Sequence, residues 1–212
     1  MDVNYVAFDS FGIKSMCIRV ETKDCSITID PGIASEVGSF PLPPYVKIKL
    51  YMKYKWRIKK STENSDVVIV THYHYDHYIC ERDESLYKNK LLLLKDPENF
   101  INKSQGKRSA RFLETIKGLP RRTRVADGKE FKIGETRISF SKPLWHGVRG
   151  TNLGYVIMVE VAEGGEKLLY SSDVDGPVLK EVTDEIIKRE PDALILDAPL
   201  LIYLDSLWLT IT

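Results

Sequence analysis

The residues best suited to chemistry in this chain lie in the segment THYHYDHY, residues 71–78. The chain has only four histidines, and three of them, His72, His74 and His77, fall within six positions. Neutral imidazole is a common ligand for zinc and similar metals. Side chains two residues apart point to the same side of extended backbone, so the first two histidines can reach one metal ion. Asp76 and the third histidine follow where the chain must turn, and they can face a second ion, an arrangement that is a recognised device for hydrolysis.

The histidine cluster could also be a polar surface loop or a structural zinc site. Three histidines and one aspartate within six residues are unusual for an incidental surface loop. Structural zinc usually has a closed tetrahedral set of ligands, often including cysteine. Cys80 is nearby, whereas Cys17 and Cys25 lie more than fifty residues upstream. A catalytic metal site is therefore the favoured hypothesis.

The elements expected to position the histidines are short, mostly apolar strands. The segment DVVIV, residues 66–70, runs directly into the histidines and lacks polar alternation, which is typical of a strand buried on both faces. The segment KLLLL, residues 90–94, has the same pattern. Further strands are expected at 3–8, 15–21, 26–30, 136–141, 154–161, 167–171 and 192–197. Active sites of open sheets usually lie at the ends of strands, which is where the histidines stand.

Two helices are expected among these strands. The Asp-Pro-Glu sequence at 96–98 is a typical helix start, and the Gly and Pro at 118–120 are a typical end. A second helix is expected to begin at the Gly-Pro pair 176–177 and to end before Pro191. The Gly-Gly pair 164–165 is expected to form a hairpin between two strands. Strands, helix, strands, helix and strand in this order favour two sheets with outer helices.

One segment, residues 45–60, resists a simple assignment. Its apolar residues alternate strictly with polar ones, which favours a strand with lysines on its outer face. These apolar residues are Val46, Ile48, Leu50, Met52, Tyr54, Trp56 and Ile58.

The composition is that of an ordinary globular protein, with 43% hydrophobic and 29% charged residues and a net charge of +1. A length of 212 residues suits one domain covering 1–212. No apolar run approaches the roughly 18 residues of a membrane span, and the N-terminus has no signal-peptide pattern, so no membrane association is expected. The three scattered cysteines favour the cytoplasm.

Four motifs in sequence order resemble the metallo-β-lactamase superfamily. The segment THYHYDH, residues 71–77, resembles its HxHxDH signature, and residues 8–32 resemble its opening strands, which end in an Asp-Pro-Gly or similar turn. The segment PLWHG contains His146, and LLYSSDVDG contains Asp173, each at the place of a metal ligand in that superfamily. The motifs together cover residues 8–176. Details such as KDP and INKSQGKR are most similar to an archaeal branch of metal-dependent hydrolases with no settled substrate.

This resemblance implies an αββα sandwich of the α/β (α+β) class, with metal ions held at one edge between the sheets. The implied ligands are divided between two ions: His72, His74 and His146 for the first, Asp76 and His77 for the second, and Asp173 bridging both. Asp30 would orient the ligand loop from outside the ligand set. The resemblance also implies that residues 44–60 are partly helical, against the alternation described above.

Two zinc ions are the implied cofactors, with manganese or iron as alternatives. His74 occupies the position where oxygen-reducing di-iron relatives commonly carry Glu, which favours zinc and hydrolysis. The implied activity is hydrolysis by a metal-bound hydroxide, because a metal lowers the pKa of bound water from about 16 toward 7. Asp76 would orient this water and accept its proton.

The chain departs from the superfamily pattern toward its C-terminus. The superfamily usually supplies one more histidine to the second ion, and no histidine follows His146 here. A shortened C-terminus is the favoured interpretation, and the alternatives are completion of the site by Asp197 or Asp205, or a weak second site. The apolar segment 200–211 is expected to cover a sheet edge or to form a homodimer contact.

The substrate is the least determined part of the function. Basic stretches at 47–60 and 103–124 flank the histidines and could hold phosphates, and Tyr73, Tyr75 and Tyr78 could stack on bases. A phosphodiester or nucleic-acid-related substrate is therefore expected, although a solvated lysine face and packed tyrosines would account for the same residues. The alternatives are a thioester, ester or lactone substrate, and a metal-binding but inactive scaffold. Four polar residues match the archaeal branch and are candidates for the cleft, although capping and helix packing account for them equally well: Lys95, Asn102, Ser104 and Gln105.

Overall fold

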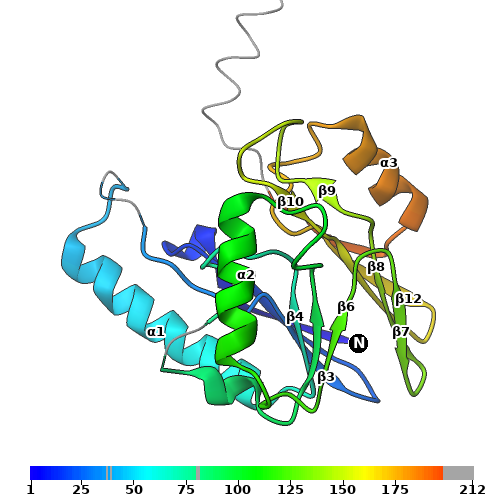
Figure 1. The fold of residues 1–212 in the computed structure, drawn as a ribbon, viewed down its shortest axis with the longest axis horizontal. Helices are drawn as coiled ribbons and strands as arrows, with labels where there is room; N and C mark the ends of the chain where they lie inside the picture. The colour runs from blue at the N-terminus through cyan, green and yellow to red at the C-terminus, as the bar shows by residue number, and fades with distance from the viewer. Residues whose placement is uncertain (37, 39, 80–81, 198–212) are drawn as a thin grey trace, which may run out of the picture.

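The structure, a computed structural model, describes residues 1–36, 38, 40–79 and 82–197. Two β-sheets lie face to face, with helices on their outer sides, in the order helix, sheet, sheet, helix (Figure 1). The expected αββα arrangement of the α/β (α+β) class is confirmed. Cys80, Asp205 and segment 200–211, for which the sequence suggests roles, lie outside the described residues.

The first sheet has six strands in sequence order. They are β1 (Asp2–Phe8), β2 (Met16–Glu21), β3 (Ser26–Ile29), β4 (Val67–Val70), β5 (Leu91–Leu94) and β6 (Arg122–Val125). The pairs β1–β2 and β2–β3 are antiparallel, whereas β3, β4, β5 and β6 are parallel neighbours. The carboxyl ends of the parallel strands therefore meet at one edge, and the histidine segment begins there.

The second sheet has five strands in the order β13-β12-β11-β8-β7. They are β7 (Glu130–Ile133), β8 (Thr136–Phe140), β11 (Val159–Glu163), β12 (Glu166–Tyr170) and β13 (Ala193–Ile195). The Gly-Gly hairpin at 164–165 is confirmed, because Glu163 pairs with Glu166 across it. A separate two-stranded ribbon joins β9 (Leu144–Trp145) to β10 (Tyr155–Val156).

Three α-helices cover the sheets: α1 (Pro44–Glu63), α2 (Lys103–Thr115) and α3 (Lys180–Arg189). Two short 3₁₀ helices, η1 (Asp9–Phe11) and η2 (Glu84–Tyr87), follow β1 and precede β5. Helices α1 and α2 lie on the first sheet and α3 lies on the second (Figure 1). No helix in the described ranges is both long enough and apolar enough to cross a bilayer.

Segment 45–60 is helical, so its interpretation as a strand is wrong and the helical structure implied by the resemblance is right. Pro44 stands at the first helical position, where its missing N–H is harmless. Tyr54 and Ile58, four residues apart, are buried against the first sheet. Met52 and Trp56 belong to the same alternation but lie on the outer side, 66% and 62% exposed. A helix with apolar residues on two faces thus imitates the period of a strand.

The expected start of α2 at 96–98 is also wrong, because the helix begins at Lys103. Asn102 is its N-cap and accepts a hydrogen bond from the backbone N of Gln105 at 2.7 Å. Asp96 instead accepts hydrogen bonds from the backbone N of Glu98 and Asn99 and closes a local turn. Short acidic side chains stabilise caps and turns equally well, so the motif did not distinguish them. Helix α3 likewise begins at Lys180 rather than directly after the Gly-Pro pair.

The expected strands are confirmed to within about two residues, except that segment 154–161 divides into β10 and β11. Strands β6, β7 and β9 were not expected. The sequence of β6, RTRV, has one apolar residue, and β9 has only two residues, so neither has a recognisable period.

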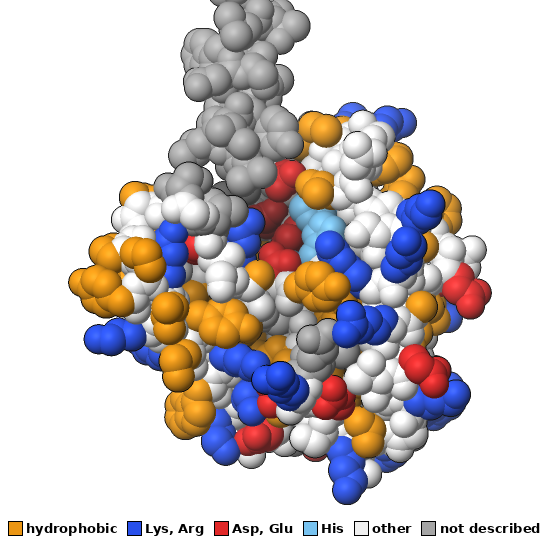
Figure 2. Space-filling view, turned by 60° about the vertical axis from the view of Figure 1, so that its left-hand side comes forward, with side chains coloured by type: hydrophobic (Ala, Val, Ile, Leu, Met, Phe, Trp, Pro, Cys, Tyr) orange, Lys and Arg blue, Asp and Glu red, His pale blue; other side chains and the backbone are white. Residues whose placement is uncertain are grey.

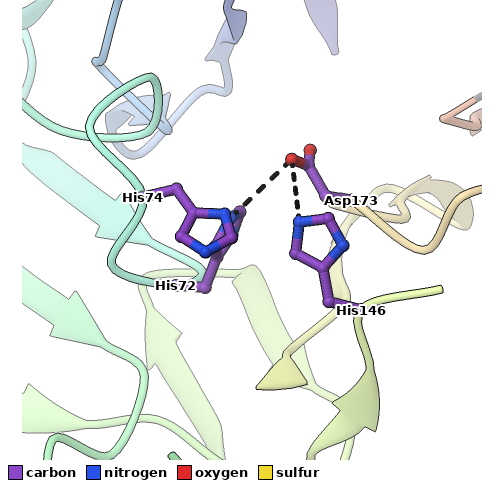
Figure 3. A group of neighbouring side chains, drawn as sticks. All are labelled: His72, His74, His146 and Asp173. Carbon is purple, nitrogen blue, oxygen red and sulfur yellow. Dashed lines mark ion pairs between the residues drawn. The ribbon is translucent and has the colours of Figure 1, made fainter. Parts of the chain in front are cut away.

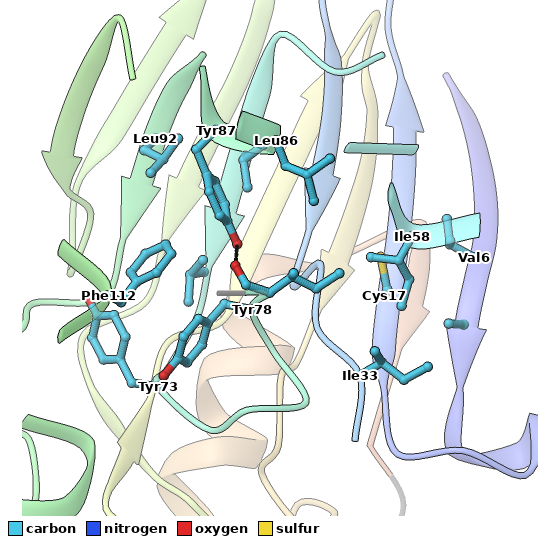
Figure 4. Close-up of a cluster of buried hydrophobic side chains, with 14 of the residues drawn as sticks. Val6, Cys17, Ile33, Ile58, Tyr73, Tyr78, Leu86, Tyr87, Leu92 and Phe112 are labelled. Carbon is cyan, nitrogen blue, oxygen red and sulfur yellow. Dashed lines mark hydrogen bonds between the residues drawn. The ribbon is translucent and has the colours of Figure 1, made fainter. Parts of the chain in front are cut away.

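The core confirms that β4 is buried on both faces. Val67 and Ile69 belong to the cluster between the two sheets, whereas Val68 and Val70 belong to the cluster beneath α1 and α2. Figure 4 shows this second cluster, in which Tyr73, Tyr78 and Phe112 are neighbours. The strand that leads into the histidines is therefore anchored on both sides.

Candidate metal centre

The loop that carries the histidines leaves β4 at the edge where the parallel strands end. Its backbone is packed directly on Gly32, in the turn that follows β3. A Cβ atom at that position would collide with the backbone nitrogens of His77 and Tyr78. Only glycine permits this close approach, so the turn and the loop are held together through their main chains.

The structure brings four side chains into one compact group: His72, His74, His146 and Asp173. One potential ligand atom from each lies within 4.8 Å of the others. The Nε2 atoms of His72 and His146 are 3.7 and 3.4 Å from Asp173 Oδ2, and both approach it from the same side (Figure 3). Two of these histidines follow β4, the third follows β9 and the aspartate follows β12, so the group joins both sheets.

A second group of ligand atoms consists of Asp76, His77 and Asp173. Nε2 of His77 is 3.0 Å from Asp173 Oδ2 and 3.9 Å from Asp76 Oδ2. Asp173 thus belongs to both groups, as a carboxylate that bridges two ions must. Asp76 is partly exposed, with 25% of its side chain accessible, whereas His77 is buried.

Asp30 lies behind His77 and is completely buried. One of its carboxylate oxygens, Oδ2, is 2.9 Å from His77 Nδ1 and also accepts hydrogen bonds from the hydroxyl groups of Thr71 and Tyr170 at 2.6 and 2.8 Å. The other oxygen accepts from the backbone N of Thr71 at 2.8 Å. Its backbone is left-handed, with φ of +50°, which is uncommon for a residue other than glycine and is typical of functional sites.

Thr71 and Tyr170 are two site residues that sequence reasoning missed. Thr71 also contacts the hydroxyl of Ser172 at 2.6 Å and thereby joins the loop after β4 to the loop after β12. The hydroxyl of Tyr170 bonds to both Asp30 and the carbonyl of Met16. Neither residue is a typical metal ligand, and only the folded arrangement reveals that they fix Asp30.

The protonation of the histidines differs between the two groups. Burial lowers the pKa of His72 well below its usual value, and neighbouring histidines lower it further. Burial and the nearby His146 and His77 lower the pKa of His74 to about 3. Burial would also lower the pKa of His77, but the carboxylates of Asp173 and Asp30 hold it well above its usual value.

The carboxylate of Asp173 responds in the opposite direction. Burial alone would raise its pKa, but the charge of His77 and a hydrogen bond from His146 hold it well below the usual value. His77 Nε2 and Asp173 Oδ2 therefore attract each other as opposite charges across 3.0 Å, with the aspartate side chain 20% exposed. Cations bound at this position would replace the imidazolium as the partner of the carboxylate.

The donor set fits a metal ion of the zinc type. One buried imidazole nitrogen that faces Asp173, Nε2 of His72, has no hydrogen-bond partner among the described residues. An unpaired buried polar atom costs about 1–3 kcal/mol, and a metal ion could satisfy such an atom. Imidazole and carboxylate ligands suit zinc, iron and manganese to different degrees, with imidazole favouring zinc and iron.

Further carboxyl groups lie near the centre, among them Asp9 and Asp197. Of these two, the sequence analysis suggested only Asp197, as a possible ligand. Burial, together with the charges of Asp173 and Asp76, raises the pKa of Asp9 to about 6. Burial and the same Asp173 charge raise the pKa of Asp197 to about 7. Asp197 accepts a hydrogen bond from the backbone N of Asp175 at 2.8 Å and is not part of any compact ligand group among the described residues. Its geometry therefore does not support the role of substitute ligand.

The four residues suggested for the cleft have different surroundings. Lys95 is completely buried, and its ammonium group is 2.8 Å from the carboxylate of Asp127, so it is not available to a substrate. Asn102 caps α2, and Ser104 is exposed on the first turn of that helix. Gln105 is buried, and its Nε2 atom lies 3.5 Å from His74 Nε2 while donating to the carbonyl of Leu153 at 2.6 Å. Only Gln105 contacts the ligand groups.

The site opens to solvent as a hollow in the surface (Figure 2). Histidine and acidic side chains are visible within it, and lysine, arginine, hydrophobic and uncharged polar side chains form the described part of its rim.

Comparison with known proteins agrees with this geometry. Residues 27–202 match the family model described as beta-lactamase superfamily domain. A UPF0282 protein of Metallosphaera sedula is 40% identical over 206 residues, which cover 94% of this chain and 66% of that protein. A UPF0282 protein of Korarchaeum cryptofilum is 41% identical over 193 residues, which cover 91% of this chain and 64% of that protein. The chain therefore spans just under two thirds of the length of these relatives.

Two solved structures have a similar fold. An isothiocyanate hydrolase from Delia radicum gut bacteria has a TM-score of 0.56 at 17% identity, covering 88% of this chain and 69% of the other. A possible metal-dependent hydrolase from Veillonella parvula has a TM-score of 0.55 at 15% identity, covering 88% of this chain and 70% of the other. At these identities the likeness concerns the fold alone.

Proposed function

Because the chain belongs to the beta-lactamase superfamily, we propose that it is a metal-dependent hydrolase with a binuclear centre. The observation that carries the proposal is the convergence of side chains from three distant stretches of the chain on one compact group of ligand atoms: His72 with His74, His146, and Asp173. Asp76 and His77 extend this group to a second position through the shared aspartate. Zinc is the proposed metal, with manganese and iron as alternatives, because the first position is rich in imidazole.

Metal ions bound at these residues would lower the pKa of a water molecule and stabilise negative charge that develops on the substrate. The protein itself would contribute orientation and proton transfer. Asp76 is partly exposed beside His77 and can accept a proton from a water molecule in the hollow. Asp30 would hold His77 through its Nδ1 atom, so that Nε2 points into the centre. Gln105 would limit the rotation of His74.

The proposed substrate is a phosphodiester or a nucleic-acid-related compound. Lysine and arginine side chains beside the hollow support this choice, since they bind phosphate through charge-assisted hydrogen bonds. Thioesters, esters and lactones are the alternative substrates that the same centre could hydrolyse. The buried thiols of Cys17 and Cys25, which form no disulfide, support a location in the cytoplasm.

The direct test measures bound metal in the purified protein and compares hydrolysis of bis-p-nitrophenyl phosphate with hydrolysis of a panel of thioesters. The proposal expects two metal ions per chain and turnover of the phosphodiester. Hydrolysis of thioesters alone would refute the phosphodiester substrate but keep the hydrolase. Absence of bound metal after reconstitution with zinc, manganese and iron would refute the metal centre itself.

A second candidate is a metal-binding scaffold without catalytic activity. It is favoured by one observation, namely that the second group offers only three ligand atoms among the described residues. This candidate expects one metal ion per chain and no turnover with any of these substrates.

A further inference from the structure

A pocket of about 290 Å³ lies on the other side of the histidine loop, between α1 and α2. None of its described lining residues belongs to the ligand groups of the metal centre. Its lining includes Tyr51, Lys55, Tyr75, Tyr78, Arg108 and Phe112. Its volume is close to the lower limit of about 300 Å³ that is usual for small-molecule pockets.

The lining combines aromatic rings with positive charge. Tyr51 and Lys55 come from α1, Arg108 comes from α2, and Tyr75 and Tyr78 come from the histidine loop. No aspartate or glutamate is found among the described lining residues. Such a pocket suits a ligand that has both a flat ring and a negative charge.

Arg108 and Lys55 are both held in place by neighbouring groups. The guanidinium of Arg108 lies 4.5 Å from the centre of the Tyr75 ring, and its Nη1 atom is 3.5 Å from the carbonyl of Tyr73. The ammonium of Lys55 is 3.1 Å from Asp83, but Lys59 binds the same carboxylate at 2.6 Å. Two lysines thus share one acid, so Lys55, Lys59 and Asp83 together carry one net positive charge.

The aromatic rings are also arranged by packing. The ring centres of Tyr75 and Tyr78 are 6.0 Å apart, and those of Tyr78 and Phe112 are 4.8 Å apart. Tyr75 remains 52% exposed, so part of its ring is available to a ligand. Stacking of a base on an aromatic ring contributes about 1–3 kcal/mol and depends little on the identity of the base.

We propose that this pocket binds a nucleoside monophosphate, with Arg108 and Lys55 contacting its phosphate and the exposed part of the Tyr75 ring contacting its base. Tyr75 stands between His74 and Asp76, so a nucleotide in the pocket would contact the same loop that carries the metal ligands. The pocket requires no metal ion and no hydrolysis. Nucleotide binding to the pocket can therefore be measured whether or not the protein is a hydrolase.

The test is calorimetric titration of the full chain with adenosine monophosphate, adenosine and inorganic phosphate. Adenosine monophosphate is expected to bind more tightly than either part, because only the whole molecule engages both the rings and the cations. Arg108→Met keeps an unbranched, flexible side chain but removes the guanidinium and its charge, and it is expected to weaken binding about tenfold. Lys55→Met, on the opposite wall, is expected to weaken binding as well.

Lys107→Met is the matched control, since Lys107 is an exposed residue of the same helix that does not line the pocket. It is expected to leave the affinity unchanged. His146→Ala removes a ligand of the metal centre from a different part of the chain and is also expected to retain nucleotide binding.

Three results would overturn the proposal. They are absence of binding by the unaltered protein, equal affinity for adenosine monophosphate and inorganic phosphate, and loss of binding in His146→Ala with retention in Arg108→Met. The last result would place the nucleotide at the metal centre instead of the pocket.

Discussion

The first ligand group of the centre, His72, His74, His146 and Asp173, offers four side chains, whereas the second, Asp76, His77 and Asp173, offers three. The histidines of the first group that follow β4 have lowered pKa values, so they are neutral and ready to bind a metal ion. The histidine of the second group is held as a cation between Asp173 and Asp30. One loop thus prepares two positions of different kinds, and we expect their metal affinities to differ.

The largest effect is expected from Asp173→Ala, because this residue belongs to both groups. Loss of a supporting residue outside the ligand set costs about 10–100-fold in metal affinity or activity, so loss of the shared ligand should cost more than about 100-fold. Bound metal, measured by elemental analysis, should fall at both positions. Retention of two metal ions or of turnover would contradict the bridging role.

Asp76→Asn should separate the two positions. It removes one ligand from the second group and leaves the first group intact. Bound metal is expected to fall from two ions to one per chain, and turnover should decrease about 100–10,000-fold if this carboxylate also transfers a proton. Loss of both ions would show that the two positions are not independent.

Asp30→Asn should weaken the second position without removing a ligand. The substitution keeps the size of the side chain but removes the charge that faces His77 Nδ1. We expect metal affinity to fall about 10–100-fold at the second position and to change little at the first. Competition against a chromophoric chelator measures both affinities, and an equal loss at the two positions would contradict the asymmetry.

A change of one pH unit is expected to have the smallest effect. The raised pKa of His77 means that a metal ion must displace a proton there, so affinity at the second position should increase with pH by up to about tenfold per unit. The lowered pKa values of His72 and His74 mean that no such proton is present on them near pH 6, so the first position should change less. Chelator competition at pH 6, 7 and 8 compares the two slopes, and parallel slopes would reject the difference.

Local patterns revealed the part of the site that is contiguous in sequence. His72, His74, Asp76 and His77 follow one buried strand, so their spacing alone places them together. No spacing connects them to His146 or Asp173, which came only from the resemblance to a superfamily. The hydrogen bonds of Thr71 and Tyr170 to Asp30 were not predictable, because they join residues 41 and 140 positions apart.

Elements of the fold were likewise predictable where the sequence pattern is local, and not where the structure depends on residues far away in the chain. The buried strands β4 and β5 were recognisable because each is a continuous apolar run between polar ends. Segment 45–60 misled the pattern because α1 has apolar side chains on its outer side as well as on its packed side. The choice between strand and helix depended on the sheet beneath it, which is tertiary information.

The close packing of Gly32 beneath the histidine loop has a consequence for protein engineering. A designer who transplants the loop into another scaffold must transfer the preceding Pro31–Gly32 turn with it, since any other residue at position 32 would push the loop outward. The two segments are about forty residues apart in the chain, but they form one transferable module.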